Sequence, residues 1–196
     1  MKIHGILLAA GFSRRFQGNK LLYLLEGKAL YLYLTERLTE LLKERIVDSL
    51  VVVSQYDEIL QEMKKRKIEV VKNENSIQGI SSSLKLGLCK AQEFEEIEGE
   101  NYYIFFVADQ PYLKKKTIER FLQAFVQSGK SIGCVKSREG MGNPVIFHEK
   151  YKKELEGLQG DKGGKSVLKQ HEKEVFYFWI EDEKELQDID ERGELS

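Results

Sequence analysis

The segment IHGILLAAGFSRRFQGNK, which runs from Ile3 to Lys20, decides the fold class that we expect for this chain. Its first part, up to Ala10, is a short apolar run that predicts a buried strand. The loop that follows combines small residues with Arg14, Arg15 and Lys20. Small residues let a ligand approach the backbone closely, and basic side chains can neutralise a polyphosphate. The alternative is a turn whose basic side chains are only solvated, and the glycines do not form the G-x-G-x-x-G dinucleotide fingerprint.

Strand and helix patterns alternate along the rest of the chain. Apolar runs predict strands at residues 49–54, 68–71, 102–108, 131–135, 144–147 and 175–180. Apolar residues at helical spacing predict helices at residues 29–43, 56–67, 80–98, 117–127 and 164–171. Strands separated by helices need crossover connections. We therefore expect an α/β fold with a mostly parallel central sheet and helices on both faces.

The composition limits the classes of protein to which the chain can belong. The 196 residues carry 31 Lys and Arg against 32 Asp and Glu, and 41% of them are hydrophobic. These values predict one globular domain over residues 1–196, and the absence of a basic surplus argues against a nucleic-acid partner. No apolar run reaches the ~20 residues of a membrane span, and the first residues do not resemble a signal peptide. We therefore expect a cytoplasmic protein with no membrane partner, in which Cys89 and Cys134 form neither a disulfide framework nor a zinc site.

Ligands in an open α/β sheet bind at the carboxyl ends of the strands, where two further segments are expected. Gly79 is followed by Ser81, Ser82 and Ser83 ahead of an apolar helical pattern. One serine satisfies a helix N-cap, and the other hydroxyls are available for a base or ribose, so both roles stay open. Asp109 comes directly after the most apolar strand, where a carboxylate can hold Mg²⁺ together with substrate phosphates. A turn-forming Asp is the alternative at that position.

Two other chemistries find little support in the sequence. Residues 164–166 read Gly-Lys-Ser like the end of a P-loop, but Gln159 stands where that motif requires Gly. His4, His148 and His171 are scattered, and no G-x-S-x-G nucleophile elbow occurs. We therefore expect neither a P-loop nor catalysis by a Ser-His-Asp or Cys-His set.

Six segments follow one another in an order that resembles a known family. The first comprises Leu8, Ala9, Ala10, Gly11, Ser13, Arg15 and Lys20. The later ones are Gly79 to Leu84, Asp109-Gln110-Pro111, Gly142-Asn143-Pro144-Val145, Gly160-Asp161-Lys162-Gly163 and Asp188-Ile189-Asp190. The first segment resembles the L-A-A-G-x-S-x-R-x-G-x-x-K signature of MobA-like nucleotidyltransferases. The serine segment and D-Q-P resemble, more narrowly, the molybdenum cofactor cytidylyltransferase branch. The chain departs from the pattern at Gly18, one position late, and at Gly164-Lys165, where the branch has Ala-Arg.

The resemblance implies a Rossmann-like three-layer nucleotidyltransferase fold. It also implies transfer of CMP from CTP to the terminal phosphate of molybdenum cofactor, with release of pyrophosphate. Arg15 would hold the β- and γ-phosphates, and Lys20 would neutralise charge on the α-phosphate. Asp109 would carry Mg²⁺, with Asp190 as the candidate second ligand. The nucleotide side would comprise Leu8, Ala9, Ala10, Gly11, Ser13, Gly79, Ser81, Ser82 and Ser83. The pterin side would comprise Gly142, Asn143, Pro144, Asp161 and Gly163.

Two alternatives to this expectation stay open. The same fold can use GTP and form a guanylyl product, because base choice depends on a few contacts. An alternative of another class is a carrier that binds molybdenum cofactor and delivers it to a molybdenum hydroxylase without catalysis. The irregular position of Gly18 and the unusual tail after Asp190 leave the carrier open.

Overall fold

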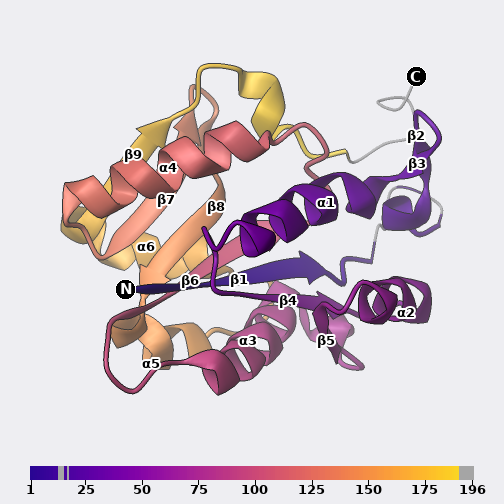
Figure 1. The fold of residues 1–196 in the computed structure, drawn as a ribbon, viewed down its shortest axis with the longest axis horizontal. Helices are drawn as coiled ribbons and strands as arrows, with labels where there is room; N and C mark the ends of the chain where they lie inside the picture. The colour runs from indigo at the N-terminus through magenta and orange to yellow at the C-terminus, as the bar shows by residue number, and fades with distance from the viewer. Residues whose placement is uncertain (13–15, 17, 190–196) are drawn as a thin grey trace.

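The computed structural model describes residues 1–12, 16 and 18–189. Within these residues a seven-stranded sheet has the order β5–β4–β1–β6–β8–β7–β9 (Figure 1). Neighbouring strands are parallel, except that β8 is antiparallel to both β6 and β7. The strands are β1 (Lys2–Ala9), β4 (Ser49–Ser54), β5 (Glu69–Lys72), β6 (Asn101–Val107), β7 (Ile132–Ser137), β8 (Gly140–His148) and β9 (Val175–Trp179). The expected α/β fold with a mostly parallel sheet is confirmed.

Helices cover both faces of the sheet and form a three-layer structure (Figure 1). One face packs against α1, α2 and α4, and the other packs against α3, α5 and α6. The helices are α1 (Leu30–Lys43), α2 (Asp57–Lys65), α3 (Ile80–Ala91), α4 (Lys115–Ser128), α5 (Lys152–Glu156) and α6 (Gly164–Gln170). No helix in the described ranges has both the length and the apolar character needed to cross a membrane.

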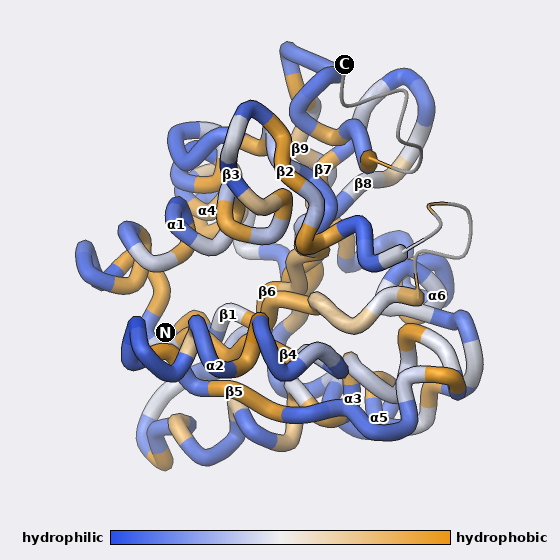
Figure 2. Tube along the Cα trace, turned by 90° about the vertical axis from the view of Figure 1, so that its right-hand side faces the viewer, coloured by the Kyte–Doolittle hydropathy of each residue, from blue (hydrophilic) through white to orange (hydrophobic). Residues whose placement is uncertain are grey.

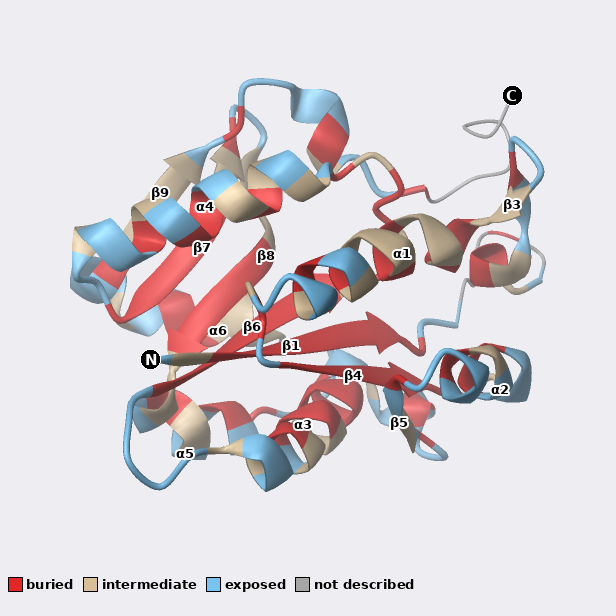
Figure 3. Ribbon diagram, viewed as in Figure 1, coloured by how far each residue is buried: buried red, intermediate tan, exposed pale blue. Residues whose placement is uncertain are grey.

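The alternation of side chains along the strands explains the two apolar layers. In β1, Leu7 belongs to the layer under α1 and α4, whereas Ile6 belongs to the layer under α3. Successive strand residues point to opposite faces, so a strand buried on both sides has an almost continuous apolar sequence. Figure 3 shows the central strands buried along their length, and Figure 2 shows the same strands as the most hydrophobic part of the interior.

Some boundaries and short elements differ from the sequence-based expectation. The helix expected at residues 80–98 ends at Ala91, and a 3₁₀ turn follows it. Phe94 and Ile97 continue the apolar spacing, but they are exposed because the chain leaves the sheet there. The short hairpin of β2 (Leu24–Leu25) and β3 (Lys28–Ala29) was not expected, and neither was α5.

The loops of interest meet at one edge of the sheet, onto which Figure 2 looks. The parallel strands β1, β5 and β6 end at this edge. Because β8 runs in the opposite direction, its first residues, Gly140 to Asn143, lie at the same edge. Gly87 brings α3 close beneath the site, since a Cβ at this position would come within 2.4 Å of Ile6 Cγ2. We call this edge the carboxyl edge.

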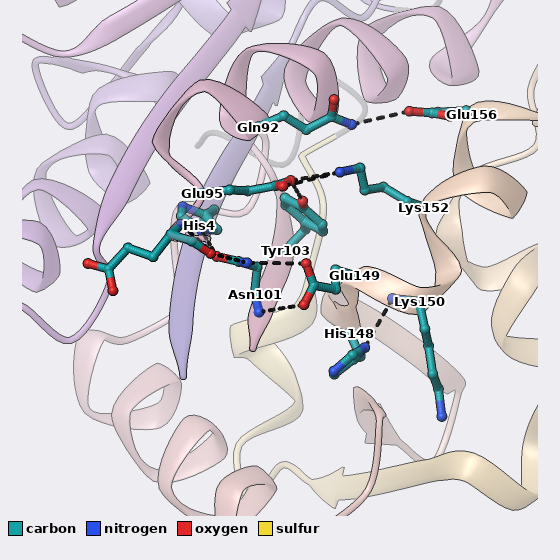
Figure 4. Close-up of polar contacts among 11 residues, drawn as sticks. His4, Gln92, Glu95, Asn101, Tyr103, His148, Glu149, Lys150, Lys152 and Glu156 are labelled. Carbon is teal, nitrogen blue, oxygen red and sulfur yellow. Dashed lines mark hydrogen bonds and ion pairs between the residues drawn. The ribbon is translucent and has the colours of Figure 1, made fainter. Parts of the chain in front are cut away.

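A polar network closes the opposite edge of the sheet (Figure 4). The imidazole of His4 is fully buried between Ser49 Oγ at 2.9 Å and Asn101 Oδ1 at 3.1 Å. Asn101 Nδ2 donates to Glu149 Oε2 at 3.1 Å. The Tyr103 hydroxyl donates to the carboxylate of Glu95. These bonds join β1, β4 and β6 to one another, to the segment before α5 at Glu149 and to the segment before β6 at Glu95.

Candidate active site

A basic and an acidic side chain meet at the carboxyl edge, between the ends of β1 and β6. Lys20 Nζ lies 2.7 Å from Asp109 Oδ2, and the side chains are only 10% and 22% exposed. Lys20 begins a 3₁₀ turn that Asn19 caps by accepting from the Leu21 amide at 3.0 Å. Asp109 follows the last residue of β6 by two positions. The two described residues that the sequence analysis expected to be catalytic therefore form an ion pair.

The pair lies in a cavity of about 370 Å³. The cavity is lined by Leu8, Ala10, Gly11, Phe12, Lys20, Leu21, Ser76, Ile77, Gly79, Ile80, Ser83, Val107, Ala108, Asp109 and Asp161. The backbone after β1 is held from the neighbouring strand, because Gln55 Nε2 donates to the Ala10 carbonyl and the Tyr56 hydroxyl donates to the Gly11 carbonyl, both at 2.7 Å. Ala9 lies behind the cavity and accepts from Ser54 Oγ at 2.8 Å.

A second cavity, of about 410 Å³, opens beside the first. Its lining is Leu8, Ile80, Leu84, Phe105, Val107, Asn143, Val145, Asp161, Lys162, Gly163, Gly164, Lys165, Ser166 and Lys169. Leu8, Val107, Ile80 and Asp161 line both cavities, and Leu8 and Val107 are paired residues of β1 and β6. The two cavities thus form one cleft over these strands, with the Lys20–Asp109 pair in one half and three lysines in the other.

Gly79 brings the two halves of the cleft together. Its φ of +92° favours glycine, and a Cβ there would lie 2.4 Å from the carbonyl carbon of Gly160 and 2.6 Å from Asp161 Oδ1. The Ser81 amide also donates to the Gly160 carbonyl, at 3.1 Å. Gly79 and the Gly160–Gly163 segment therefore pack directly against each other. This contact holds Asp161 at the place where the two cavities join.

The three serines are buried and differ in what their hydroxyls do. Ser82 Oγ donates to the Gly79 carbonyl at 2.8 Å and accepts from Asn73 Nδ2 at 2.9 Å. Ser83 Oγ accepts from the same Asn73 amide at 2.8 Å and lines the first cavity. A hydroxyl has one proton to donate, so that of Ser82 is committed to the protein, whereas Ser83 can still donate into the cavity. Asn73 holds both serines, and the sequence analysis did not identify it.

The loop that carries Asp109 is fixed from two directions. The Ile189 amide donates to the Asp109 carbonyl at 3.1 Å, and Gln110 Nε2 donates to the Leu186 carbonyl at 3.2 Å. From α1, Arg37 Nη1 donates to the carbonyls of Pro111 and Leu113, the latter at 2.8 Å. Burial lowers the pKa of the Arg37 guanidinium, which nearby carboxylates partly oppose.

The other expected site residues are distributed as follows. Asn143 and Gly163 line the second cavity, as does Asp161. Gly142 lies against the chain after β9, since a Cβ there would be 2.6 Å from Leu186 Cδ1. Pro144 follows a cis peptide bond in β8. Ser13, Arg15 and Asp190 lie outside the described residues.

The donor set at Asp109 fits a hard cation that arrives with a polyphosphate. Asp109 and Asp161 both line the first cavity. In the part of the chain that the structure describes, no group of three or more His, Cys, Asp or Glu side chains is placed to hold a metal. Mg²⁺ commonly uses one or two carboxylates and takes its other ligands from water and substrate phosphates.

Comparisons with known proteins identify the family of the chain. The model of the MobA-like NTP transferase domain matches residues 5–175. A probable molybdenum cofactor guanylyltransferase of Pyrococcus horikoshii is 31% identical over 170 residues, which are 86% of this chain and 79% of that protein. A protein of the same description from Thermococcus gammatolerans is 31% identical over 135 residues, 67% of this chain and 60% of the relative.

A solved structure shows the same fold. A nucleotidyl transferase from Methanothermobacter aligns with a TM-score of 0.77 at 18% identity, covering 98% of this chain and 93% of the other. The family match extends over most of the chain and includes the described residues of the first cavity. The chain belongs to the MobA-like NTP transferase family of nucleotidyltransferases.

Proposed function

We propose that the protein transfers a nucleoside monophosphate from a nucleoside triphosphate to the terminal phosphate of molybdenum cofactor. The observation that carries this proposal is the continuous cleft, which has Lys20 and Asp109 in one half and Lys162, Lys165 and Lys169 in the other. Both substrates of such a transfer are anionic, and each half of the cleft offers cationic side chains to one of them.

The reaction joins an oxygen of the cofactor phosphate to the α-phosphorus and breaks the bond from that phosphorus to the bridging oxygen. Pyrophosphate leaves with the bonding electron pair. Lys20 neutralises charge on the α-phosphate, Arg15 holds the β- and γ-phosphates, and Asp161 lies where donor and acceptor meet. A bound Mg²⁺ would add positive charge to the triphosphate. Transfers of this kind depend mainly on positioning and on stabilisation of charge.

Asp109 is the residue that we propose to hold Mg²⁺, and Asp190 is the second candidate. The Ile189 amide donates to the Asp109 carbonyl, which supports this pairing, since Ile189 precedes Asp190 in the sequence.

We propose CTP as the nucleotide, because the serine segment and the D-Q-P segment resemble the cytidylyltransferase branch. Ser83 supports a nucleotide contact in this segment, since it lines the first cavity. GTP is the second candidate, because the two curated relatives are described as probable guanylyltransferases.

We further propose that the product serves a molybdenum hydroxylase, and that residues 1–196 act as one domain in the cytoplasm.

One incubation tests these proposals. The purified protein is mixed with molybdenum cofactor, Mg²⁺ and either CTP or GTP, and the dinucleotide product and pyrophosphate are identified. We expect molybdopterin cytosine dinucleotide and one pyrophosphate per turnover. A guanine dinucleotide would select the second candidate. Tight binding of the cofactor without pyrophosphate from any nucleotide would show a carrier instead of an enzyme.

A further inference from the structure

A row of aromatic and basic side chains lies on the open sheet face next to the second cavity. Tyr177 and Trp179 project from the edge strand β9, and Lys136 projects from β7 beside it. Lys136 Nζ lies 4.9 Å from the centre of the Tyr177 ring and 5.1 Å from that of Trp179. Trp179 is 58% exposed. We call these three residues the aromatic shelf.

The shelf continues the floor of the second cavity. Val145 lines that cavity and pairs with Cys134 of β7, which in turn pairs with Tyr177 of β9. Val145, Cys134 and Tyr177 belong to the same apolar layer, so their side chains share one face of the sheet. Neighbouring strands lie about 4.8 Å apart, which puts Tyr177 about 10 Å from the cavity wall at Val145. Trp179 is two residues further along β9 and therefore faces the same side.

The cationic half of the cleft lies on the same face of the sheet as the shelf. Burial raises the pKa of the Cys134 thiol to about 11, and the Lys165 charge acts on this thiol in the opposite direction. Lys165 lines the second cavity, whose wall at Val145 pairs with Cys134 of β7. A ligand that extends from the cavity along this face meets basic groups first and aromatic rings next.

This arrangement suits an acceptor with a phosphate at one end and a flat heterocycle at the other. Exposed lysine–aromatic pairs are common on protein surfaces, so the cation–π contacts alone do not indicate a site. The position of the shelf, in line with a cavity that holds three lysines, is what distinguishes it. Aromatic rings stack on heterocycles, and an ammonium can donate to a ring carbonyl.

We propose that Tyr177, Lys136 and Trp179 hold the pterin ring of the acceptor while its terminal phosphate points past the lysines toward Asp161. This subsite rests on the proposed function, because it names the part of the acceptor that this face receives. It makes the shelf a determinant of acceptor specificity with no contact to the nucleotide.

The chain supplies its own reporter, because Trp179 is its single tryptophan. Full-length protein is titrated with neopterin monophosphate, and the quenching of tryptophan fluorescence gives the binding constant. Glycerol phosphate, which has the phosphate without the ring, is the matched ligand. We expect quenching by the pterin compound alone, and about tenfold weaker binding in Tyr177→Ala, since stacking on one ring contributes a factor of this order.

Phe94→Ala is the matched protein control. Phe94 is 37% exposed and has Lys90 Nζ 5.9 Å from its ring centre, but it follows the far end of α3. We expect this variant to bind neopterin monophosphate like the parent. Two results would overturn the shelf. One is Trp179 fluorescence that does not change at high concentrations of neopterin monophosphate. The other is an equal loss of affinity for this compound in Tyr177→Ala and Phe94→Ala.

Kinetics distinguish the shelf from the proposed function. We expect Trp179→Ala to raise KM for molybdenum cofactor about tenfold, with KM for the nucleotide unchanged, and Trp179→Phe to restore it. An unchanged cofactor KM in an active Trp179→Ala variant overturns the shelf alone. The opposite result is also distinguishable. If neopterin monophosphate quenches Trp179 and Tyr177→Ala weakens this binding, but the protein forms no dinucleotide with any nucleotide, the shelf is supported and the transferase is contradicted.

Discussion

Lys20 and Asp109 form an ion pair in the candidate active site. Their contact of 2.7 Å lies in a cavity wall where both side chains are mostly buried, so either charge alone would be costly. Under the proposed function, Lys20 acts on the phosphates and Asp109 on the cation, so both groups act on the same triphosphate. The ion pair thereby links the two groups that the proposed transfer needs.

We expect Lys20→Ala and Asp109→Ala each to lower turnover about 100-fold or more, because each removes charge stabilisation at the reacting phosphates. The measurement is pyrophosphate release with the preferred nucleotide, alongside circular dichroism to establish folding. Lys72→Ala is the control, since Lys72 forms a 2.8 Å pair with Asp57 on the exposed surface. Near-normal release from a folded Lys20 or Asp109 variant contradicts the assignment.

The same ion pair predicts weak metal binding by the free protein. Lys20 Nζ contacts the carboxylate that a cation would use, and two unit charges at this distance interact by about 1.5–6 kcal/mol at dielectric constants between those of water and a protein surface. We expect Lys20→Met to bind Mn²⁺ about tenfold or more tightly in the absence of nucleotide. Electron paramagnetic resonance of free Mn²⁺ measures this. Equal affinities in Lys20→Met and the parent would show that Lys20 does not compete at Asp109.

Gly79→Ala should be strongly destabilising. A left-handed φ costs about 1–3 kcal/mol for a residue with a side chain, and the new Cβ would also overlap Gly160. Urea unfolding measures the loss. Gly11→Ala is the control, because a Cβ at Gly11 has no atom within 4 Å. Equal unfolding free energies for the two variants would be inconsistent with the contact described.

The sequence predicts several site residues but not the contacts between them. Lys20 stands out as part of a basic loop after the first strand, Gly79 as the residue before three serines, and Asp109 as an acid after an apolar strand. Asn73 and Arg37 do not, because an amide or guanidinium that binds loop atoms looks like any polar surface residue. Their partners lie up to 76 positions away, and only the fold brings them together.

At the scale of elements, periodicity predicts the types of the long segments well and their ends less well. The apolar spacing of α3 runs on past Ala91, although the packing partner ends there. The direction of β8 could not be read from alternation of strands and helices, since β7 and β8 follow each other with a turn of two residues. That reversal puts Asn143 at the site.

Removing Asn101 from the polar network at the edge opposite the carboxyl edge should lower stability without weakening substrate binding (Figure 4). Asn101→Ala leaves buried His4 without one partner and should lower the unfolding free energy by about 1–3 kcal/mol. KM for the nucleotide should not change, because the network lies at the opposite edge from the cleft. Gln92→Ala, which removes an exposed 3.1 Å bond to Glu156, is the control for thermal unfolding. A large loss in the control as well would argue against a special role for Asn101.

At the scale of the molecule, burial distinguishes the two cysteines. Cys89 is exposed on α3, whereas Cys134 is buried and its pKa is raised by burial to about 11. The thiolate is the reactive form, so at pH 8 we expect one fast equivalent of alkylation, at Cys89, and slow reaction at Cys134. Peptide mass spectrometry of the labelled native protein measures this. Fast labelling of both sites in the folded protein contradicts the described core.

The hydrogen bond from the Ile189 amide to the Asp109 carbonyl can form only late in synthesis of the chain. A ribosome adds the residue at position 189 about 80 residues after Asp109, which takes about 4–16 s at ordinary rates of synthesis. During this interval the strands of the nucleotide half are already made, but the Asp109 loop lacks its last main-chain partner. The newborn chain can therefore pair β5, β4, β1 and β6 early, whereas the Asp109 loop gains its contact with Ile189 only after residue 189 has been added.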